Sequence, residues 1–199
     1  MPVAGHGRFY AHAGGLPART RARPGDALAL LAVTTLAEAA AQADALAQQG
    51  DERALADLRR VWDQQVEDDA RDEDFRHRAT AFRAIGQFRW RQKIELLNRG
   101  LDDQSPAARG SALISLELLS REHPRVVNDI RPMLHRMASG DPNDAVKRLA
   151  IVCLSRTSPN RDTITLLAGM SDDDRYEREI REAAKKTSAA LKKRSDTAK

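Results

Sequence analysis

Apolar residues recur at helical spacing along most of the chain. Upstream of the acidic stretch 67–74 they stand at Leu55, Leu58, Trp62 and Val66, three or four residues apart, which places them on one face of a helix. A β-strand would instead show alternating runs of Val, Ile, Thr and aromatic residues, and the sequence has no such run. Ala, Leu and Arg, which favour helices, are abundant. The pattern therefore predicts an all-α chain.

The helix with this apolar face is preceded by another predicted helix. It is expected to run from Ala27 to Gln49, with Asp26 as its N-cap and Gly50 as the residue that ends it. Asp51 then caps the next helix.

The two ends of the chain depart from the helical pattern. Residues 1–25 are rich in Gly and Pro and contain four Arg and no acidic residue, which is typical of a flexible arm. We therefore expect a flexible basic N-terminal arm at 1–25, a helical repeat domain at 26–194 and a flexible basic tail at 195–199.

Downstream of the acidic stretch the sequence repeats itself. Each unit has an acid-rich turn, a basic residue, an Ala three residues later and another small residue three beyond that. The four Ala residues are separated by 31, 38 and 34 positions: Ala81, Ala112, Ala150 and Ala184. A second amphipathic segment follows in three units, at residues 90–100, 125–138 and 162–170. Each unit is therefore predicted to be a helical hairpin, and stacked hairpins bury their apolar faces in one core.

The turn and the first helix of these units resemble the HEAT-repeat family, in particular the short repeats also found in phycobilin lyase-like proteins. The segment from Leu101 to Arg109, followed by Ala112, has the acidic turn, proline, arginine and alanine of that family, and 140–147 with Ala150 is similar. The resemblance covers about residues 70–190. It implies an α-solenoid of about four to five helical hairpins, a HEAT-like superhelix, whose role is to bind other macromolecules.

The basic residue of each unit has two interpretations. The four are Arg78, Arg109, Lys147 and Arg181. The resemblance implies that each pairs with the turn acid of an adjacent unit, forming a series of ion pairs between hairpins. Alternatively, these bases line the concave face of the solenoid and hold an acidic partner.

Charge is strongly segregated along the chain, although the net charge is only +4. Residues 26–75 contain 4 bases and 13 acids, whereas residues 76–101 contain 7 bases and 1 acid. A further group of bases lies near the C-terminus: Lys185, Lys186, Lys192, Lys193, Arg194 and Lys199.

The basic hairpin 76–101 supplies the candidate binding residues. They are Arg76, Arg83, Arg89, Trp90, Arg91 and Lys93, which we expect to form an exposed basic face. Bases interleaved with aromatic rings can hold phosphates and stack on nucleobases. Two other interpretations remain: the Phe residues of this hairpin have core spacing, and the acidic segment 26–75 can neutralise the basic hairpin beside it.

Residues suited to catalysis or metal binding are scattered. The five His do not cluster, and the single Cys153 occupies a small, apolar position expected in the core. Phosphate-binding Gly-rich loops and hydrolase motifs are missing. Some HEAT-like solenoids are DNA glycosylases, and Trp62 and Trp90 permit the comparison, but no local motif carries it. We therefore expect no catalytic residue, cofactor, metal ion or small-molecule substrate.

These observations predict a non-catalytic binding or adaptor protein, a scaffold for protein–protein interaction. The alternative is a nucleic-acid-binding HEAT-like solenoid, related to DNA repair, that uses the basic hairpin 76–101. No apolar run approaches the roughly 18 residues that span a bilayer, so no membrane partner is expected. A lone cysteine and no clear export signal favour a cytoplasmic location.

Overall fold

The computed structural model describes residues 35–197, which form an all-α solenoid. This part contains ten α-helices, one 3-10 helix and no strand, so the all-α prediction is confirmed. The helices are α2 (Leu36–Gln49), α3 (Glu52–Asp69), α4 (Phe75–Gln87), η1 (Arg91–Lys93), α5 (Ile94–Gly100), α6 (Pro106–Ser120), α7 (Arg125–Asn128), α8 (Arg131–Gly140), α9 (Asp144–Ser155), α10 (Arg161–Asp172) and α11 (Arg178–Thr197).

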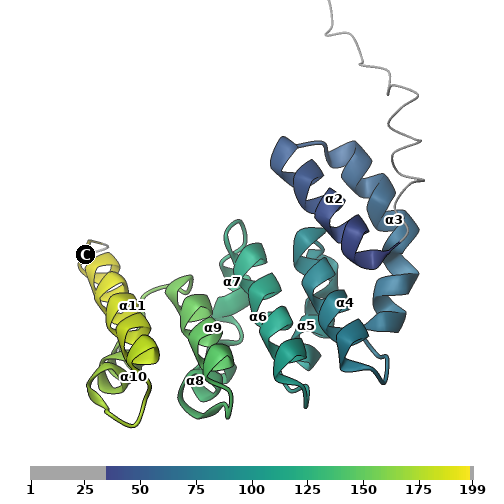
Figure 1. Cartoon of the computed structure of the whole chain (residues 1–199). Helices are drawn as coiled ribbons and strands as arrows, with labels where there is room; N and C mark the ends of the chain where they lie inside the picture. Colours follow the sequence, from purple (N-terminus) through teal and green to yellow (C-terminus); the bar gives the residue numbers. More distant parts are fainter. Residues whose placement is uncertain (1–34, 198–199) are drawn as a thin grey trace, which may run out of the picture. The chain divides into compact units, whose positions relative to one another are not determined.

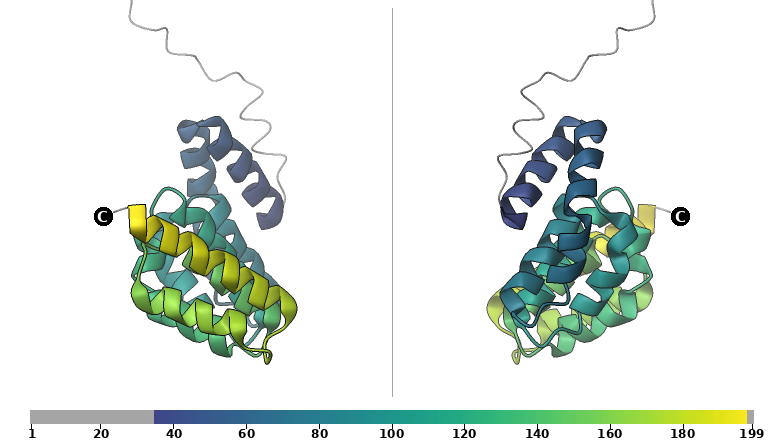
Figure 2. Two further views of the ribbon diagram at one scale, coloured as in Figure 1. Left: turned by 90° about the vertical axis from the view of Figure 1, so that its left-hand side faces the viewer. Right: turned by 90° about the vertical axis from the view of Figure 1, so that its right-hand side faces the viewer.

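The helices form hairpins that follow one another in chain order (Figure 1). Helices α2, α4, α6, α9 and α11 are the first helices of successive units, and each packs against the next. The second helices pack beside them: α5 contacts α4 and α6, α8 contacts α9, and α10 contacts α11. Figure 2 shows α10 and α11 side by side. Four hairpins followed by α11 agree with the predicted number.

The repeated small residues allow the first helices to approach closely. All four repeat Ala side chains are fully buried. Between α4 and α6 the hydroxyl of Ser115 donates a hydrogen bond of 2.6 Å to the carbonyl oxygen of Phe82 and accepts one of 3.2 Å from the backbone N–H of Gly86. A Cβ atom on Gly86 would lie 2.7 Å from Cα of Ser115, closer than real Cβ contacts. Glycine is therefore required here because the two helix backbones meet.

Cys153 takes the position in α9 that Ser115 takes in α6. Its thiol is completely buried and donates a hydrogen bond of 3.2 Å to the carbonyl oxygen of Leu113. Burial raises the pKa of the Cys153 thiol far above its usual range. The prediction that Cys153 is a core residue is confirmed.

The helix predicted from Ala27 to Gln49 does not run through Thr35, and residues 27–34 lie outside the described part of the chain. At Thr35 the backbone is extended (φ −126°, ψ 153°), and α2 begins at Leu36. Thr35 and Glu38 form a capping box: the Thr35 hydroxyl accepts from the Glu38 N–H at 3.2 Å, and the Glu38 carboxylate accepts from the Thr35 N–H at 3.1 Å. This reciprocal cap supplies the helix start that the periodicity did not reveal.

Two other predicted boundaries can be compared with the structure. Gly50 ends α2 in the left-handed conformation (φ 73°), as predicted. The predicted domain boundary at residue 194 lies inside α11, which continues to Thr197, so residues 195–197 are helical. The predicted arm at 1–25 and the cap at Asp26 lie outside the described residues.

Candidate interaction surface

Two of the repeat bases link successive units in the same way. Arg78 of α4 donates from Nε and Nη2 to both carboxylate oxygens of Asp103, at 2.7 and 2.8 Å. Its Nη1 donates to the carbonyl oxygens of Asp72 and Glu73, at 2.9 and 2.8 Å, in the turn before its own helix. Arg78 therefore joins two acid-rich turns, and its guanidinium holds the pKa of Asp103 below the usual range.

Arg109 of α6 repeats this arrangement one unit further on. Its Nε and Nη2 bind the two carboxylate oxygens of Asp141, both at 2.8 Å. Its Nη1 donates to the carbonyl oxygens of Asp103 and Gln104, at 2.8 and 3.1 Å. The resemblance implied such pairing between units, and Arg78 and Arg109 have it. The guanidinium N–H groups of Arg78 and Arg109 are therefore used within the protein and are unavailable to a binding partner.

Lys147 and Arg181 do not make this link. Nζ of Lys147 binds Asp144 of its own helix at 2.7 Å and lies 5.8 Å from the centre of the Tyr176 ring. Arg181 binds Asp174, in the turn before its own helix, at 2.5 Å. The implied pairing with an adjacent unit is therefore wrong at both positions. At Lys147 the reason is chemical, since an ammonium group lacks the planar fork that spans a carboxylate and two carbonyl groups.

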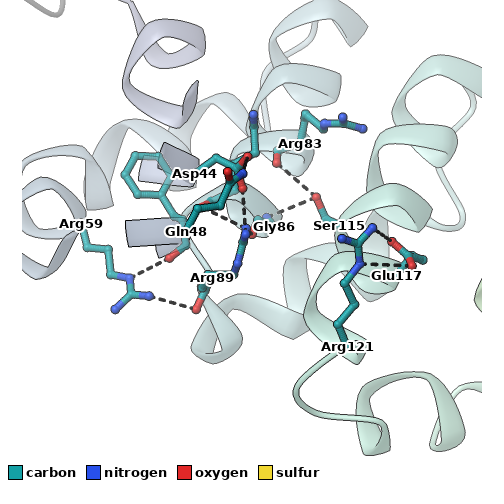
Figure 3. Close-up of polar contacts among 11 residues, drawn as sticks. Asp44, Gln48, Arg59, Arg83, Gly86, Arg89, Ser115, Glu117 and Arg121 are labelled. Atoms are coloured by element: carbon teal, nitrogen blue, oxygen red, sulfur yellow. Dashed lines mark hydrogen bonds and ion pairs between the residues drawn. The ribbon is translucent and has the colours of Figure 1, made fainter. Parts of the chain in front are cut away.

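Arg89, one of the candidate binding residues, is bound within the protein (Figure 3). It follows α4 in a left-handed backbone conformation (φ 53°). Its Nη2 pairs with Asp44 of α2 at 2.8 Å, and its Nη1 donates to two carbonyl oxygens at the end of α4, at 2.9 and 3.3 Å. Arg59 of α3 donates to the carbonyl oxygens of Phe88 and Arg89, at 2.8 and 3.3 Å. These two arginines fix α4 to α2 and α3.

Trp90 and Lys93 are buried rather than exposed, each with 7% of its surface accessible. Nζ of Lys93 lies 2.6 Å from Glu67 and 3.1 Å from Asp63, both on α3, and 4.7 Å from the centre of the Trp90 ring. The hydrogen bond from Lys93 lowers the pKa of Glu67. The expectation of one exposed basic face is therefore wrong for Arg89, Trp90 and Lys93. Acids of helices α2 and α3 neutralise Arg89 and Lys93, which was the alternative interpretation.

The remaining candidates, Arg76, Arg83 and Arg91, are exposed. Arg76 lies 3.8 Å from Asp74 and Arg91 lies 3.4 Å from Nδ1 of His123. The side chain of Arg83 makes no hydrogen bond or ion pair with residues 35–197, and Figure 3 shows it pointing away from the Asp44–Arg89 pair. Arg83 is thus the candidate with a free guanidinium in the described part of the chain.

Arg83 lies in a groove between α2, α4 and α6 with a volume of about 280 Å³. The other groove residues are small or uncharged: Ala37, Ala40, Ala79, Thr80, Gln87 and Ser111. A carboxylate entering this groove would meet one unpaired guanidinium and little steric obstruction.

Helix α6 continues this surface with an uncharged outer side. Spacings of four, three and four residues place Ala107, Ser111, Ile114 and Leu118 on one side of the helix, and all four are exposed or half-buried. We call these four residues the α6 face. Helix α9, which packs against α6, has the exposed apolar residue Val152, with 42% of its surface accessible.

The two charged residues within α6, Arg109 and Glu117, are buried. Arg109 is buried in the link to Asp141. Glu117 is also buried, which raises its pKa, but hydrogen bonds from Arg121 and Arg156 outweigh burial and give a net decrease. Sequence reasoning missed the α6 face because it followed charge. The signal was present as uncharged residues at positions 107, 111, 114 and 118.

Residues 35–197 contain no group of three or more His, Cys, Asp or Glu side chains arranged to hold a metal ion. In the same residues, no helix combines the length and apolar character needed to cross a bilayer.

Comparison with known proteins agrees with the stacked hairpins. Residues 101–187 match the family model of HEAT repeats. This match covers α6 to α10, where the Arg109–Asp141 link lies, and the first half of α11. Comparison with curated proteins finds no match. HEAT repeats generally serve as helical-repeat scaffolds for protein interaction. The matched region, residues 101–187, therefore consists of HEAT repeats, and these stack as a solenoid with the other described helices.

Proposed function

We propose that this chain is a non-catalytic binding or adaptor protein whose protein partner docks on the α6 face and in the adjoining groove. The observation that carries the proposal is the uncharged outer side of α6 next to the unpaired guanidinium of Arg83. Ser111 belongs to both surfaces, so the groove and the α6 face are continuous.

This surface has the composition of a protein interface. Such interfaces have a core depleted of charge and enriched in Arg and apolar side chains. Ile114 and Leu118 supply apolar area, while Arg83 can pair with a carboxylate of the partner. The linked turns on either side of α6 hold the helix in place, which limits the conformational entropy lost on binding.

The basic hairpin 76–101 supports nucleic-acid binding less well. Trp90 is buried and cannot stack on a base, and Arg89 and Lys93 are paired with acids of α2 and α3. These contacts favour a protein partner over the nucleic-acid alternative for this part of the chain.

Site-specific photo-crosslinking tests the proposal. A benzoylphenylalanine at Ile114 should yield a discrete crosslinked protein in cells that express the chain, because the α6 face is the contact surface. The same group at Thr165, exposed on α10, is the matched control and should not yield that product. Arg83→Glu should reduce the yield from Ile114 without changing the helical circular dichroism. Equal products from Ile114 and Thr165, or none from Ile114, would refute the proposed surface.

A further inference from the structure

Helix α11 carries a group of bases that the rest of the solenoid does not neutralise. Its buried side, Ile180, Ala184, Thr187 and Leu191, packs against α9 and α10. Another part of its surface presents four exposed lysines: Lys185, Lys186, Lys192 and Lys193. We call these four residues the lysine stripe.

The lysine stripe has no acidic partner among the described residues. None of the four lysine side chains makes a hydrogen bond or an ion pair with any residue in 35–197. No acid occurs between Lys185 and Arg194, and the acids nearer the start of α11, Glu179 and Glu182, pair with Arg148 and Arg178. The positive charge of the stripe is therefore available to a partner.

Arg194 anchors the helix that carries the stripe. Its Nη2 donates to the carbonyl oxygens of Ser155 and Thr157, at 2.7 and 3.0 Å, in the segment that ends α9. The stripe is thus part of a helix held at its C-terminal end.

The shape of the stripe suits a row of phosphates. The pair at 185 and 186 precedes the pair at 192 and 193 by seven residues, or about 10.5 Å along a helix. Ala189 and Ala190 lie between the pairs, so no long side chain separates them.

The same residues argue against two other partners. No large apolar side chain of α11 is exposed, so the stripe lacks the apolar core of a protein interface and the apolar side that inserts into a membrane. Contacts between lysine and phosphate need neither, because they depend on charge and on the release of counterions.

We infer that the lysine stripe of α11 binds the phosphate backbone of double-stranded nucleic acid, without reading its bases. This site is separate from the α6 face and from the basic hairpin 76–101. It gives the scaffold a second binding function that stands independently of the proposed protein partner.

Fluorescence anisotropy with a labelled 20-base-pair DNA duplex tests the inference between about 50 and 200 mM salt. Four phosphate contacts predict a slope of log K against log salt of roughly −3.6, and hence about a hundredfold loss of affinity over this range. Replacing all four lysines with Gln should abolish this binding. The double variants K185Q/K186Q and K192Q/K193Q should each lower the slope by about 1.8 in magnitude.

The matched control is the triple variant R76Q/R83Q/R91Q, which removes exposed positive charge from another part of the solenoid. It should bind the duplex with the slope of the wild-type protein, and so should the wild-type protein with a duplex of unrelated sequence. The inference is overturned if no binding occurs at 50 mM salt, if the quadruple variant binds normally, or if the triple variant loses as much affinity. Displacement of the duplex by polyglutamate at equal charge concentration would also overturn it.

Discussion

Arg109 and Asp141 form a two-point ion pair that crosses from one repeat to the next, with both hydrogen bonds at 2.8 Å. The side chains are only 11% and 5% exposed. A buried carboxylate that loses its partner remains desolvated and unpaired. Removing one member of such a pair therefore lowers the free energy of unfolding strongly. Because both side chains are this deeply buried, we expect the stability of the described helices to depend strongly on this pair.

Arg109→Met should lower the free energy of unfolding by about 3–5 kcal/mol, because it leaves the Asp141 carboxylate buried without its partner. Urea denaturation followed by circular dichroism measures the change. The control is Arg161→Met, an exposed arginine without a partner in the described residues, which should change stability by no more than about 0.5 kcal/mol. If the effects of Arg109→Met and Asp141→Asn simply add in a double-mutant cycle, the two residues are not coupled.

Gly86→Ala should destabilise the protein by about 1–3 kcal/mol, because the new Cβ would lie 2.7 Å from Cα of Ser115 and force α4 away from α6. Gly169→Ala is the matched control in α10, where a Cβ would have no atom within 4 Å. That change should stabilise the protein by about 0.5–1 kcal/mol through helix propensity. Thermal unfolding distinguishes the two: a stable Gly86→Ala variant would contradict the close contact between α4 and α6.

The ion pair between Arg78 and Asp103 should make stability depend on acid pH. Arg78 lowers the pKa of Asp103 in the folded protein, whereas an unfolded Asp titrates at about 3.9. The stability due to the pair is therefore present above about pH 4 and is lost as the pH falls through the lower, folded pKa. Urea unfolding at pH 7, 5 and 3 should show a smaller acid-induced loss in Asp103→Asn than in the wild-type protein. Equal losses in both proteins would exclude Asp103 as a contributor.

Cys153 should not react with thiol reagents in the folded protein, because its thiol is completely buried and its pKa is raised by that burial. Absorbance with Ellman's reagent at pH 8 should show negligible reaction in buffer and one thiol per chain in guanidinium chloride. Rapid reaction in buffer would indicate that α9 separates readily from α6.

The repeat pattern of the sequence predicted the hairpins because small residues and apolar positions are local properties. Ala81 and Ala112 are fully buried where neighbouring first helices pack, and the acid-rich turns stand where predicted. The start of α2 was predicted wrongly because the apolar run in the sequence continues past Thr35. The hydrogen bonds between Thr35 and Glu38 instead make Thr35 the N-cap of the helix.

The candidate basic face was only partly predictable, because exposure depends on residues far away in the chain. Lys93 is buried by Glu67 and Asp63, and nothing near Lys93 in the sequence indicates that α3 lies over it. Arg83 has no such partner in the described residues, although the two bases belong to the same hairpin. The segregation of charge therefore indicated that the acidic segment can pair with the basic hairpin. It could not indicate which acid pairs with which base.

The shared role of Asp103 has a consequence for how such a chain can change length. Its carboxylate receives a hydrogen bond from Arg78, while its backbone carbonyl receives one from Arg109, so this turn belongs to two successive repeats. Asp141 receives Arg109 as Asp103 receives Arg78. Excising residues 103–140 would therefore bring Asp141 into line with Arg78 and restore the same joint. A whole repeat could therefore be inserted or lost while the ion pair between Arg78 and the aspartate of the next turn is kept.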